Sequence, residues 1–277
     1  MTYEEFKKLF ETKLKEELPG YDISIEKDMK VNSSCECICI KKLADTSIFD
    51  GFRFEMPALF REFLKWGDFE KIIESIKKSI KIKRPAEQSF VQELLSCPSN
   101  LLITFQAINA ELNKEFLKEV PHITMCDLAL ICRLTKEGGD GICSTVLTNR
   151  LLQRLGWSKE DVFTEKRLGT NALLDFEVLD FSFGTSFVLH AVTNKMKING
   201  AACIFFPSVL EQVRKKLGYD FYIIPSSVHE ILLVEKSFAE AEECKMIIKE
   251  VNHEAVAEDE ILSYNLYELA NGKVSIV

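Results

Sequence analysis

The sequence predicts an α+β fold in which antiparallel sheets are built from repeated strand–strand–helix units with helices packed on one face, plus a smaller N-terminal α+β lobe. Two observations lead to this prediction. Apolar residues alternate along pairs of neighbouring segments, which is the pattern of half-buried strands. Each pair is followed by a segment with helical spacing, and this order occurs three times. Strands joined by short turns pair antiparallel, so the order favours α+β over a parallel, doubly wound sheet.

The composition is that of an ordinary globular protein. Hydrophobic residues make up 47% and charged residues 28% of the 277 residues, which excludes a wholly disordered or collagen-like chain. This length corresponds to one or two domains. The 35 basic and 43 acidic side chains give a net charge of −8, which favours solubility and argues against a dedicated nucleic-acid surface.

Three features lead us to expect a cytoplasmic protein that does not enter a membrane. The longest run without a charged residue, 94–110, is interrupted by polar residues and is too short to span a bilayer. The first residues lack the basic start and apolar run of a secretory signal. The nine cysteines are an odd number in a chain of ordinary size, which favours free thiols in a reducing compartment.

The N-terminal lobe is expected to begin with an amphipathic helix. Thr2 and Glu5 have the spacing of a capping box, and apolar residues recur at helical spacing until Pro19 and Gly20 end the helix. Alternation then predicts two short strands and a third, and apolar stripes predict two helices. These segments are 22–28, 34–42 and 48–54 for the strands, and 57–66 and 68–83 for the helices.

Basic residues gather at the end of the second of these helices, at Lys77, Lys78, Lys81, Lys83 and Arg84. Cations at the C-terminal end of a helix interact favourably with the helix dipole. A solvated helix end is therefore the preferred interpretation. Weak nucleic-acid binding through the Lys77 to Arg84 cluster is kept as an alternative.

The stretch 85–100 is the weakest for regular structure, and we expect the domain boundary there. The predicted division is an N-terminal α+β lobe over 1–90 and a C-terminal α+β domain over 91–277, with one compact unit as the alternative. The C-terminal domain is expected to begin with a strand over 101–107 and a helix over 109–119.

The strand–strand–helix order then follows three times. The first copy turns through Gly138 to Gly141, and the second turns through Asn194 to Gly200. The predicted elements are 125–134, 142–147 and 149–155 in the first copy, 186–192, 201–206 and a helix from Ser208 in the second, and 220–224, 229–234 and 239–251 in the third.

Three cysteines, Cys35, Cys37 and Cys39, alternate with other residues and would share one face of an extended strand. Zinc sites place two to four residues between neighbouring cysteine ligands, so this spacing does not match them. We therefore expect buried apolar packing for the three thiols. No metal and no cofactor are predicted.

The polar segment 225–230 holds the only candidate catalytic residues, Ser227 as nucleophile and His229 as general base. On a regular strand His229 and Glu230 point to opposite faces, so the acid could not orient the imidazole. The sequence also lacks the Gly-x-Ser-x-Gly turn that exposes a nucleophilic serine. A turn whose serines bond the backbone is therefore favoured over a hydrolytic site.

Candidate ligand-binding residues lie in two predicted turns. Asn194, Lys195 and Asn199 belong to the turn of the second copy, and Ser226 belongs to the turn of the third. If the two copies pack side by side, these polar groups would converge into a small rim that suits an anion. The hypothesis rests on the position of the turns.

Two segments carry a resemblance to a known family. They are TNKMKINGAACIFFPSVL over 193–210 and DFYIIPSSVHEILLV over 220–234, supported by Pro121-His122 and by Asp127-Leu128-Ala129. The sequence resembles an uncharacterised family of Gram-positive gut bacteria, catalogued as domain of unknown function 5688. The resemblance implies a common fold and brings no catalytic residues. It departs at 169–172, where relatives tend to have an Asn-x-Pro-Arg segment.

The sequence therefore favours a non-catalytic binding or regulatory protein over an enzyme. Its expected partner is a protein or a small polar ligand, without nucleic acid or membrane. A hydrolase that uses Ser227 and His229 is the first alternative, and nucleic-acid binding is the second.

Overall fold

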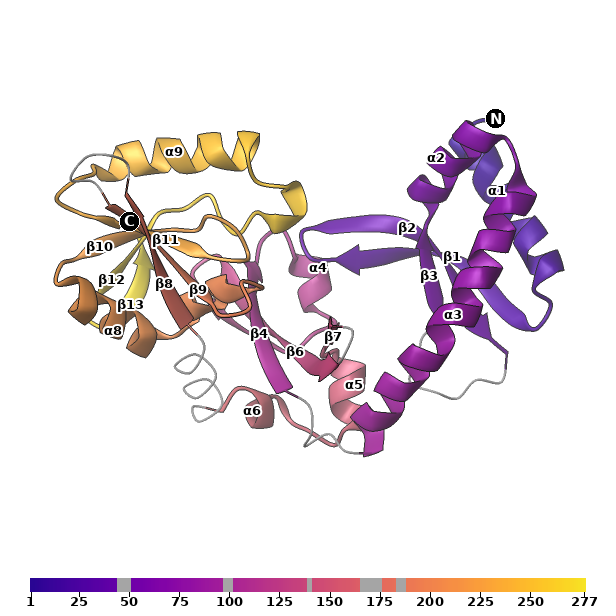
Figure 1. The fold of residues 1–277 in the computed structure, drawn as a ribbon, viewed down its shortest axis with the longest axis horizontal. Coiled ribbons are helices and arrows are strands. Elements are labelled where there is room, and N and C mark those ends of the chain that lie inside the picture. Colours follow the sequence, from indigo (N-terminus) through magenta and orange to yellow (C-terminus); the bar gives the residue numbers. More distant parts are fainter. Residues whose placement is uncertain (44–50, 97–101, 139–140, 165–175, 183–187) are drawn as a thin grey trace. The chain divides into compact units, whose positions relative to one another are not determined.

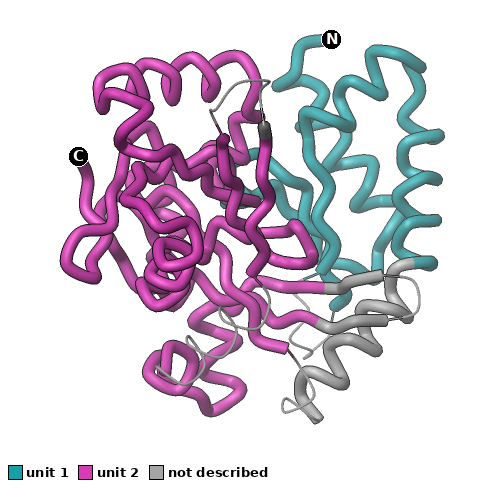
Figure 2. The backbone as a smooth tube through the Cα atoms, turned by 60° about the vertical axis from the view of Figure 1, so that its left-hand side comes forward, with its two compact units in different colours: residues 1–30, 34–100 teal, residues 31–33, 101–277 magenta. Residues whose placement is uncertain are grey.

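The computed structural model describes residues 1–43, 51–96, 102–138, 141–164, 176–182 and 188–277. The backbone divides into two compact units, one made of residues 1–30 and 34–100 and the other of residues 31–33 and 101–277 (Figure 2). The boundary that the sequence places at residue 90 stays a prediction.

The N-terminal unit is a three-stranded antiparallel sheet with three helices. Its elements are α1 (Tyr3–Glu17), β1 (Tyr21–Lys30), β2 (Ser33–Lys42), β3 (Phe52–Glu55), α2 (Met56–Trp66) and α3 (Phe69–Ser96), with strand order β1-β2-β3 (Figure 1). The predicted capping box is confirmed, because Thr2 Oγ1 accepts from the Glu5 N–H at 3.3 Å and the Thr2 N–H donates to Glu5 at 2.8 Å. Residues 48–50 of the predicted third strand lie outside the described residues.

The core of this unit lies between the helices and one face of the sheet. Ile38 and Ile40 of β2 belong to it, and the alternation of a strand therefore sends Cys37 and Cys39 to the opposite face. Aromatic rings of the helices fill the centre, where Phe6 stacks on Phe10 and on Phe69 with centroids 5.2 and 5.6 Å apart. In this unit the helices cover one face, as predicted.

The expected irregular segment after residue 84 is wrong over most of its length. Helix α3 runs through Pro85 to Ser96. The residues after the proline, Ala86-Glu87-Gln88, have high helix propensity, and the loss of one backbone hydrogen bond at Pro85 does not end the helix. Residues 97–100 lie outside the described residues.

The C-terminal unit contains two antiparallel sheets. The four-stranded sheet consists of β4 (Leu102–Asn109), β5 (His122–Met125), β6 (Leu128–Gly138) and β7 (Gly141–Val146). Strand β6 pairs with β4 on one side and with β5 and then β7 on the other. Short helices α4 (Lys114–Leu117), α5 (Asn149–Arg154) and α6 (Lys159–Val162) connect or follow these strands.

Two predictions for this sheet are corrected. The chain does not run straight from Met125 to Leu134, because Cys126 has φ +55° and turns β5 back into β6. The helix expected over 109–119 is reduced to α4. Side-chain hydrogen bonds replace it, since the Leu112 N–H donates to Asn109 Oδ1 at 2.9 Å and Asn113 Nδ2 donates to the Asn109 carbonyl at 2.7 Å. The predicted turn residues 139 and 140 lie outside the described residues.

The six-stranded sheet has the order β13-β12-β10-β11-β9-β8. Its strands β9, β10 and β11 were predicted, and β8, β12 and β13 are additional. Helices η2 (Gly200–Phe205), α8 (Pro207–Leu217) and α9 (Ala241–Glu254) accompany it. The strand bounds are β8 (Phe176–Ser182), β9 (Val188–Asn194), β10 (Phe221–Ile224), β11 (Ile231–Glu235), β12 (Tyr267–Ala270) and β13 (Lys273–Ile276).

The antiparallel sheets and the helices confirm the α+β class, but in the six-stranded sheet helices cover both faces rather than one (Figure 1). Ile248 of α9 packs with Val234 of β11. The other face carries His190, which pairs with Leu233 and hydrogen-bonds Tyr219 just after α8. Alternate residues of a strand point to opposite faces, so α8 and α9 lie on different sides.

The predicted strand over 201–206 is wrong, because residues 200–205 form the 3₁₀ helix η2. Five of its six residues are buried, so the segment is apolar on all sides. Periodicity cannot separate a buried strand from a buried helical turn in so short an apolar run. The second strand–strand–helix copy therefore lacks its second strand.

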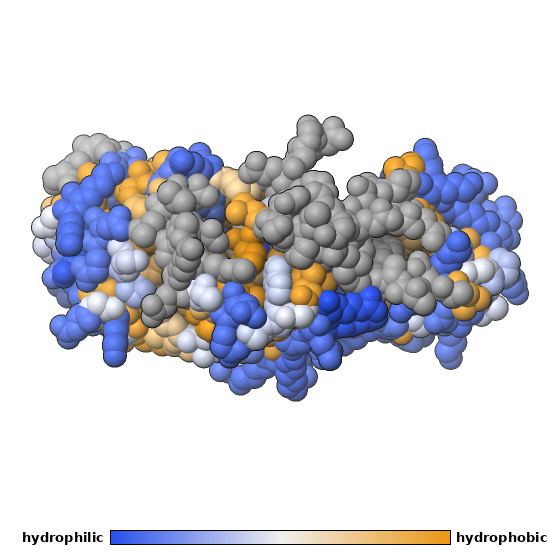
Figure 3. All heavy atoms as spheres, turned by 90° about the horizontal axis from the view of Figure 1, so that it is seen from below, coloured by the Kyte–Doolittle hydropathy of each residue, from blue (hydrophilic) through white to orange (hydrophobic). Residues whose placement is uncertain are grey.

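The surface seen from below in Figure 3 is largely hydrophilic, with hydrophobic residues in smaller groups. Individual exposed side chains such as Leu64, Trp66 and Met246 are normal for a globular surface. Among the described residues, no helix has the length and apolar character needed to cross a membrane.

A buried hydrogen-bond cluster joins the two sheets of the C-terminal unit. Asp127, in the turn between β5 and β6, accepts hydrogen bonds from Ser263 Oγ at 2.7 Å and from the Tyr267 hydroxyl of β12 at 2.6 Å. Tyr267 has no exposed surface, and its burial together with the Asp127 carboxylate raises its pKa. The carboxylate thus fixes the β5–β6 turn against β12.

We expect Tyr267→Phe to lower the free energy of unfolding by about 1.5–3 kcal/mol, the usual contribution of a hydrogen bond to a charged group. Because the pKa of Tyr267 is raised in the folded state, the hydroxyl contributes its full stabilisation of the fold below the unfolded-state pKa of about 10. This stabilisation is lost as the pH rises from that value through the folded-state pKa. Urea unfolding between neutral and strongly alkaline pH measures both effects. Equal stability of the variant and the unaltered protein at neutral pH would contradict the assignment.

Candidate functional site

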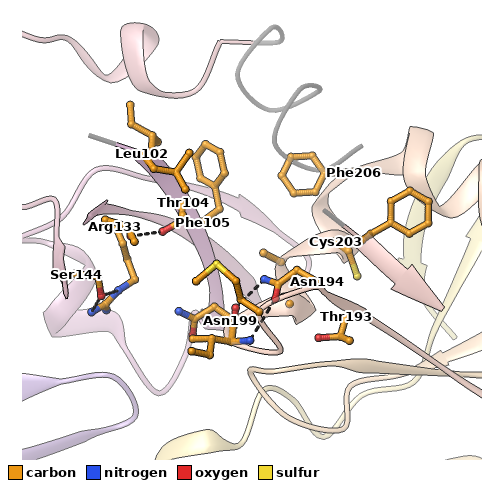
Figure 4. Close-up of a pocket in the computed structure, with 17 residues that line it drawn as sticks. Leu102, Thr104, Phe105, Arg133, Ser144, Thr193, Asn194, Asn199, Cys203 and Phe206 are labelled. Carbon is orange, nitrogen blue, oxygen red and sulfur yellow. Dashed lines mark hydrogen bonds between the residues drawn. The ribbon is translucent and has the colours of Figure 1, made fainter. Parts of the chain in front are cut away.

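A cavity of about 200 Å³ lies in the C-terminal unit between the two sheets (Figure 4). Residues of β4, β6 and β7 line it from the four-stranded sheet. Residues of β8, β9, the loop after β9 and η2 line it from the six-stranded sheet, together with Phe206. This is where side chains of both sheets enclose a space large enough for a small organic molecule.

The position of the cavity follows from the edge of β4. Within the described chain β4 pairs only with β6, so its other edge lies toward η2. Residues from both faces of β4 reach the cavity, namely Ile103 and Phe105 from one face and Thr104 from the other. Because side chains from both faces of β4 line the cavity, the cavity lies along the unpaired edge of this strand.

One side of the cavity is apolar. The rings of Phe105 and Phe206 lie 6.2 Å apart between centroids, and Figure 4 shows Phe105 beside Leu102 and Thr104. Leu102 and Ile198 keep 42% and 45% of their surface exposed, although both line the cavity. Exposed aliphatic surface at a cavity mouth is stabilised when a ligand covers it.

The other side carries a partly buried cation, Arg133 of β6. Its Nε and Nη2 donate to Ser144 Oγ at 3.2 and 3.0 Å, and its Nη1 donates to Gln106 Oε1 at 3.2 Å. Burial lowers the pKa of Arg133, but a guanidinium stays charged at neutral pH. All of its partners in the described part of the chain are neutral, so the charge lacks a counter-ion there.

The loop between β9 and η2 contributes further polar residues to the lining of the cavity. Asn194 closes the loop on itself, because its Nδ2 donates to the Ile198 carbonyl at 2.7 Å and its Oδ1 accepts from the Ile198 N–H at 3.2 Å. Lys197 and Asn199 adopt φ +53° and +57°, which make the loop tight. Asn194 and Asn199 both line the cavity.

The structure brings the two predicted polar loops together. The Asn199 N–H donates to Nδ1 of His229 at 3.3 Å, and Thr193 Oγ1 donates to the His229 carbonyl at 2.8 Å. Of the four candidate ligand-binding residues, Asn194 and Asn199 reach the cavity. Lys195 is exposed and Ser226 bonds to Glu230, and neither of them lines it.

The candidate catalytic residues are not arranged as a relay. Ser227 Oγ donates to Glu230 at 3.0 Å and accepts from the His229 backbone N–H at 3.0 Å. The His229 ring lies between the Asn199 N–H and Glu260, with Nε2 3.4 Å from the Glu260 carboxylate. No hydrogen bond joins the Ser227 hydroxyl to this imidazole, both residues being described. The hydrolase hypothesis stays a prediction without geometric support.

A second histidine, His190 of β9, is held at both ring nitrogens. Its Nδ1 lies 2.8 Å from the Asp180 carboxylate, and its Nε2 hydrogen-bonds the Tyr219 hydroxyl. The ring is buried, while most of the Asp180 side chain is exposed. These bonds connect β8, β9 and the end of α8, which is a structural role.

The cysteines of β2 share one face of the strand, as predicted, and Cys37 and Cys39 are buried, but their hydrogen-bond neighbours are polar rather than apolar. Sγ of Cys35 and Cys37 lie 3.4 Å apart, and Cys39 Sγ lies 3.5 Å from Glu26. Burial raises the pKa of the Cys39 thiol. In the part of the chain that the structure describes, no group of three or more His, Cys, Asp or Glu residues is placed to hold a metal ion.

One lysine of the basic cluster of α3 forms an ion pair with an acidic residue. Lys77 forms an ion pair of 2.6 Å with Glu17, whereas Lys78 and Lys81 are exposed. The side chains of Lys83 and Arg84 lie outside those that the structure describes. Nucleic-acid binding stays a prediction.

Sequence reasoning did not select Arg133, Ser144 and Gln106 as site residues. A signal was present, because Arg133 is the only charged residue between Leu128 and Thr135 in an otherwise largely apolar strand. A charge within such a strand needs a partner or a function. The identity of its neighbours depends on strand register, which the sequence does not state.

We expect Gly200→Ala to lower the free energy of unfolding by about 1–3 kcal/mol, the range for overpacking. A Cβ at this position would lie 2.6 Å from both the Asn194 nitrogen and the His229 carbonyl oxygen. Gly20→Ala is the matched control, since nothing lies within 4 Å of its Cβ. Denaturant unfolding compares the two variants, and equal effects would refute the close-contact explanation.

We expect Ser227→Ala to lower the free energy of unfolding by about 1–3 kcal/mol, because the partly buried Glu230 and His229 groups lose a partner. Ser226→Ala serves as the control with a single, longer bond of 3.3 Å and should cost less. Esterase turnover that disappears in Ser227→Ala and in His229→Ala, with unchanged stability, would instead support the hydrolase alternative.

The comparisons with known proteins add a family and no activity. No curated protein and no solved structure matches the chain. The sequence matches the Family of unknown function (DUF5688) over residues 3–182 and 182–270, which together span both units and the whole cavity. The chain therefore belongs to the family of unknown function DUF5688.

Proposed function

We propose that the C-terminal unit binds a small organic molecule in the cavity between its two sheets and acts as a binding or regulatory protein. The observation that carries this proposal is the composition of the lining, with an apolar side at Phe105 and Phe206 and a partly buried cation at Arg133. Small-molecule sites combine mostly apolar walls with a few placed polar groups.

The polar groups of the site are held in place before any ligand arrives. Ser144 and Gln106 fix the Arg133 guanidinium, and the Asn194–Ile198 hydrogen bonds fix the loop between β9 and η2. Binding to groups that are already oriented costs less conformational entropy. This supports a binding role for the cavity.

Among the described residues that line the cavity, the groups needed for catalysis by proton transfer are absent. The described lining contains no His, Asp, Glu, Lys or Tyr side chain. Cys203 is the only thiol in that lining, and complete burial raises its pKa to about 12, so it stays protonated at neutral pH. A protonated thiol is a poor nucleophile. Binding without chemistry is therefore the better supported function.

We further infer a bacterial protein in a reducing compartment such as the cytoplasm. Five described cysteines, Cys35 and Cys39 among them, are free thiols. The inference of bacterial origin rests on the family resemblance alone. A protein partner stays a second proposal for the regulatory role.

We expect Ala202→Leu to abolish small-molecule binding while leaving the fold intact. Ala202 lines the cavity, and the added carbons would occupy its space. Ala255→Leu, at an exposed position, is the matched control. A ligand-detected NMR screen with a fragment library gives the readout. Hits that bind the two variants equally well would show that the cavity is not the binding site.

A further inference from the structure

We propose that the cavity selects an organic carboxylate with a compact apolar body, and that Arg133 pairs with the carboxylate group. This inference rests on the proposed function and names the ligand class of the same site. It is carried by the hydrogen bonds that Arg133 leaves unused, by the sign of the charge in the lining and by the position of the apolar wall.

Arg133 has hydrogen-bond donors that its described protein partners do not use. A guanidinium has five N–H groups. The Ser144 hydroxyl takes one from Nε and one from Nη2, and Gln106 takes one from Nη1. One N–H on each terminal nitrogen is left without an acceptor among the described residues. Two donors on one planar group match the two oxygens of a carboxylate.

The positive charge of Arg133 has no counter-ion among the described residues. A cation removed from water needs a counter-ion, because its desolvation is otherwise uncompensated. The surface guanidinium of Arg214 has such partners, Glu211 at 2.9 Å and Asp220 at 3.3 Å. Arg133 is more buried and has only neutral partners in the described chain. An anionic ligand would supply the missing charge.

The charge of the described lining fits a monoanion better than a phosphate. Arg133 is the only cationic side chain in the described lining, so a dianion would leave one negative charge uncompensated. The Asn199 side-chain amide also lines the cavity and has no hydrogen-bond partner among the described residues, which leaves it for a second polar contact. One cation with one free amide suits a carboxylate.

Apolar residues of the lining could contact the rest of the ligand. Phe105 and Phe206 form an apolar wall with ring centroids 6.2 Å apart, and Leu102, with 42% of its surface exposed, lies on the same side of the view as Arg133 (Figure 4). A carboxylate on the guanidinium would place its attached carbon chain or ring against this wall. The cavity of about 200 Å³ limits that body to a short aliphatic chain or a single ring.

Isothermal titration calorimetry with two matched series tests the proposal on the complete chain. The probes are octanoate with octanamide and octanol, and hydrocinnamate with hydrocinnamamide, all at neutral pH. We expect at least one acid to bind about ten-fold or more tightly than its own amide, as a charge-assisted bidentate contact implies. This comparison uses the unaltered protein and does not depend on the folding of a variant.

Variants of Arg133 identify the group responsible. Arg133→Met should bring the acid's affinity down to that of its amide, and Arg133→Lys should recover only part of the difference, because lysine has no planar pair of donors. Arg154→Met makes the same change at an exposed arginine of α5 and should have no effect. Circular dichroism of each variant verifies its fold.

The outcomes separate this inference from the proposed function. Acids and amides that bind equally tightly, with binding blocked by Ala202→Leu, would overturn carboxylate selection and support a ligand cavity. An acid preference that survives Arg133→Met would overturn the role of Arg133. If no probe binds and the fragment screen gives no cavity ligand, both proposals are refuted.

Discussion

The close approach of Gly200 to the backbone of its neighbours is the constraint on which the candidate site depends. A Cβ there would lie 2.3 Å from Thr193 Oγ1 and 2.6 Å from the His229 carbonyl oxygen, so only glycine lets the end of β9 meet the loop before β11. The tight contact sets the start of η2. That helix in turn brings Ala202 and Cys203 to the unpaired edge of β4, where they form one wall of the cavity.

A second constraint fixes the two sheets of the C-terminal unit against each other. Asp127 leaves the four-stranded sheet at the β5–β6 turn and bonds Ser263 and Tyr267 of the region around β12. Hydrogen bonds to a charged acceptor are stronger than those between neutral groups, and these are partly buried. Because the cavity walls come from both sheets, the rigidity of this cluster keeps the cavity in shape.

The electrostatics of the cavity differ from those of the protein surface. Ion pairs such as Lys118–Glu115 and Lys114–Glu111 join exposed side chains of nearby residues and contribute little to stability. Arg133 instead lies partly buried among Ser144 and Gln106. A cation in that position costs desolvation energy, which the proposed anionic ligand would offset.

The sequence by itself determined the α+β class, the capped first helix, most of the paired strands and the two polar turns around Asn194 and Ser226, because capping, alternation and turn chemistry are local. It did not determine η2, since a short apolar run fits a strand or a helical turn equally well, or the strands β8, β12 and β13, which are short and mix polar with apolar residues. Only the tertiary structure decided that Arg133, Asn194 and Asn199 line one cavity while Lys195 and Ser226 do not. Strand register and sheet packing bring residues far apart in the chain together, and neither is written in local sequence.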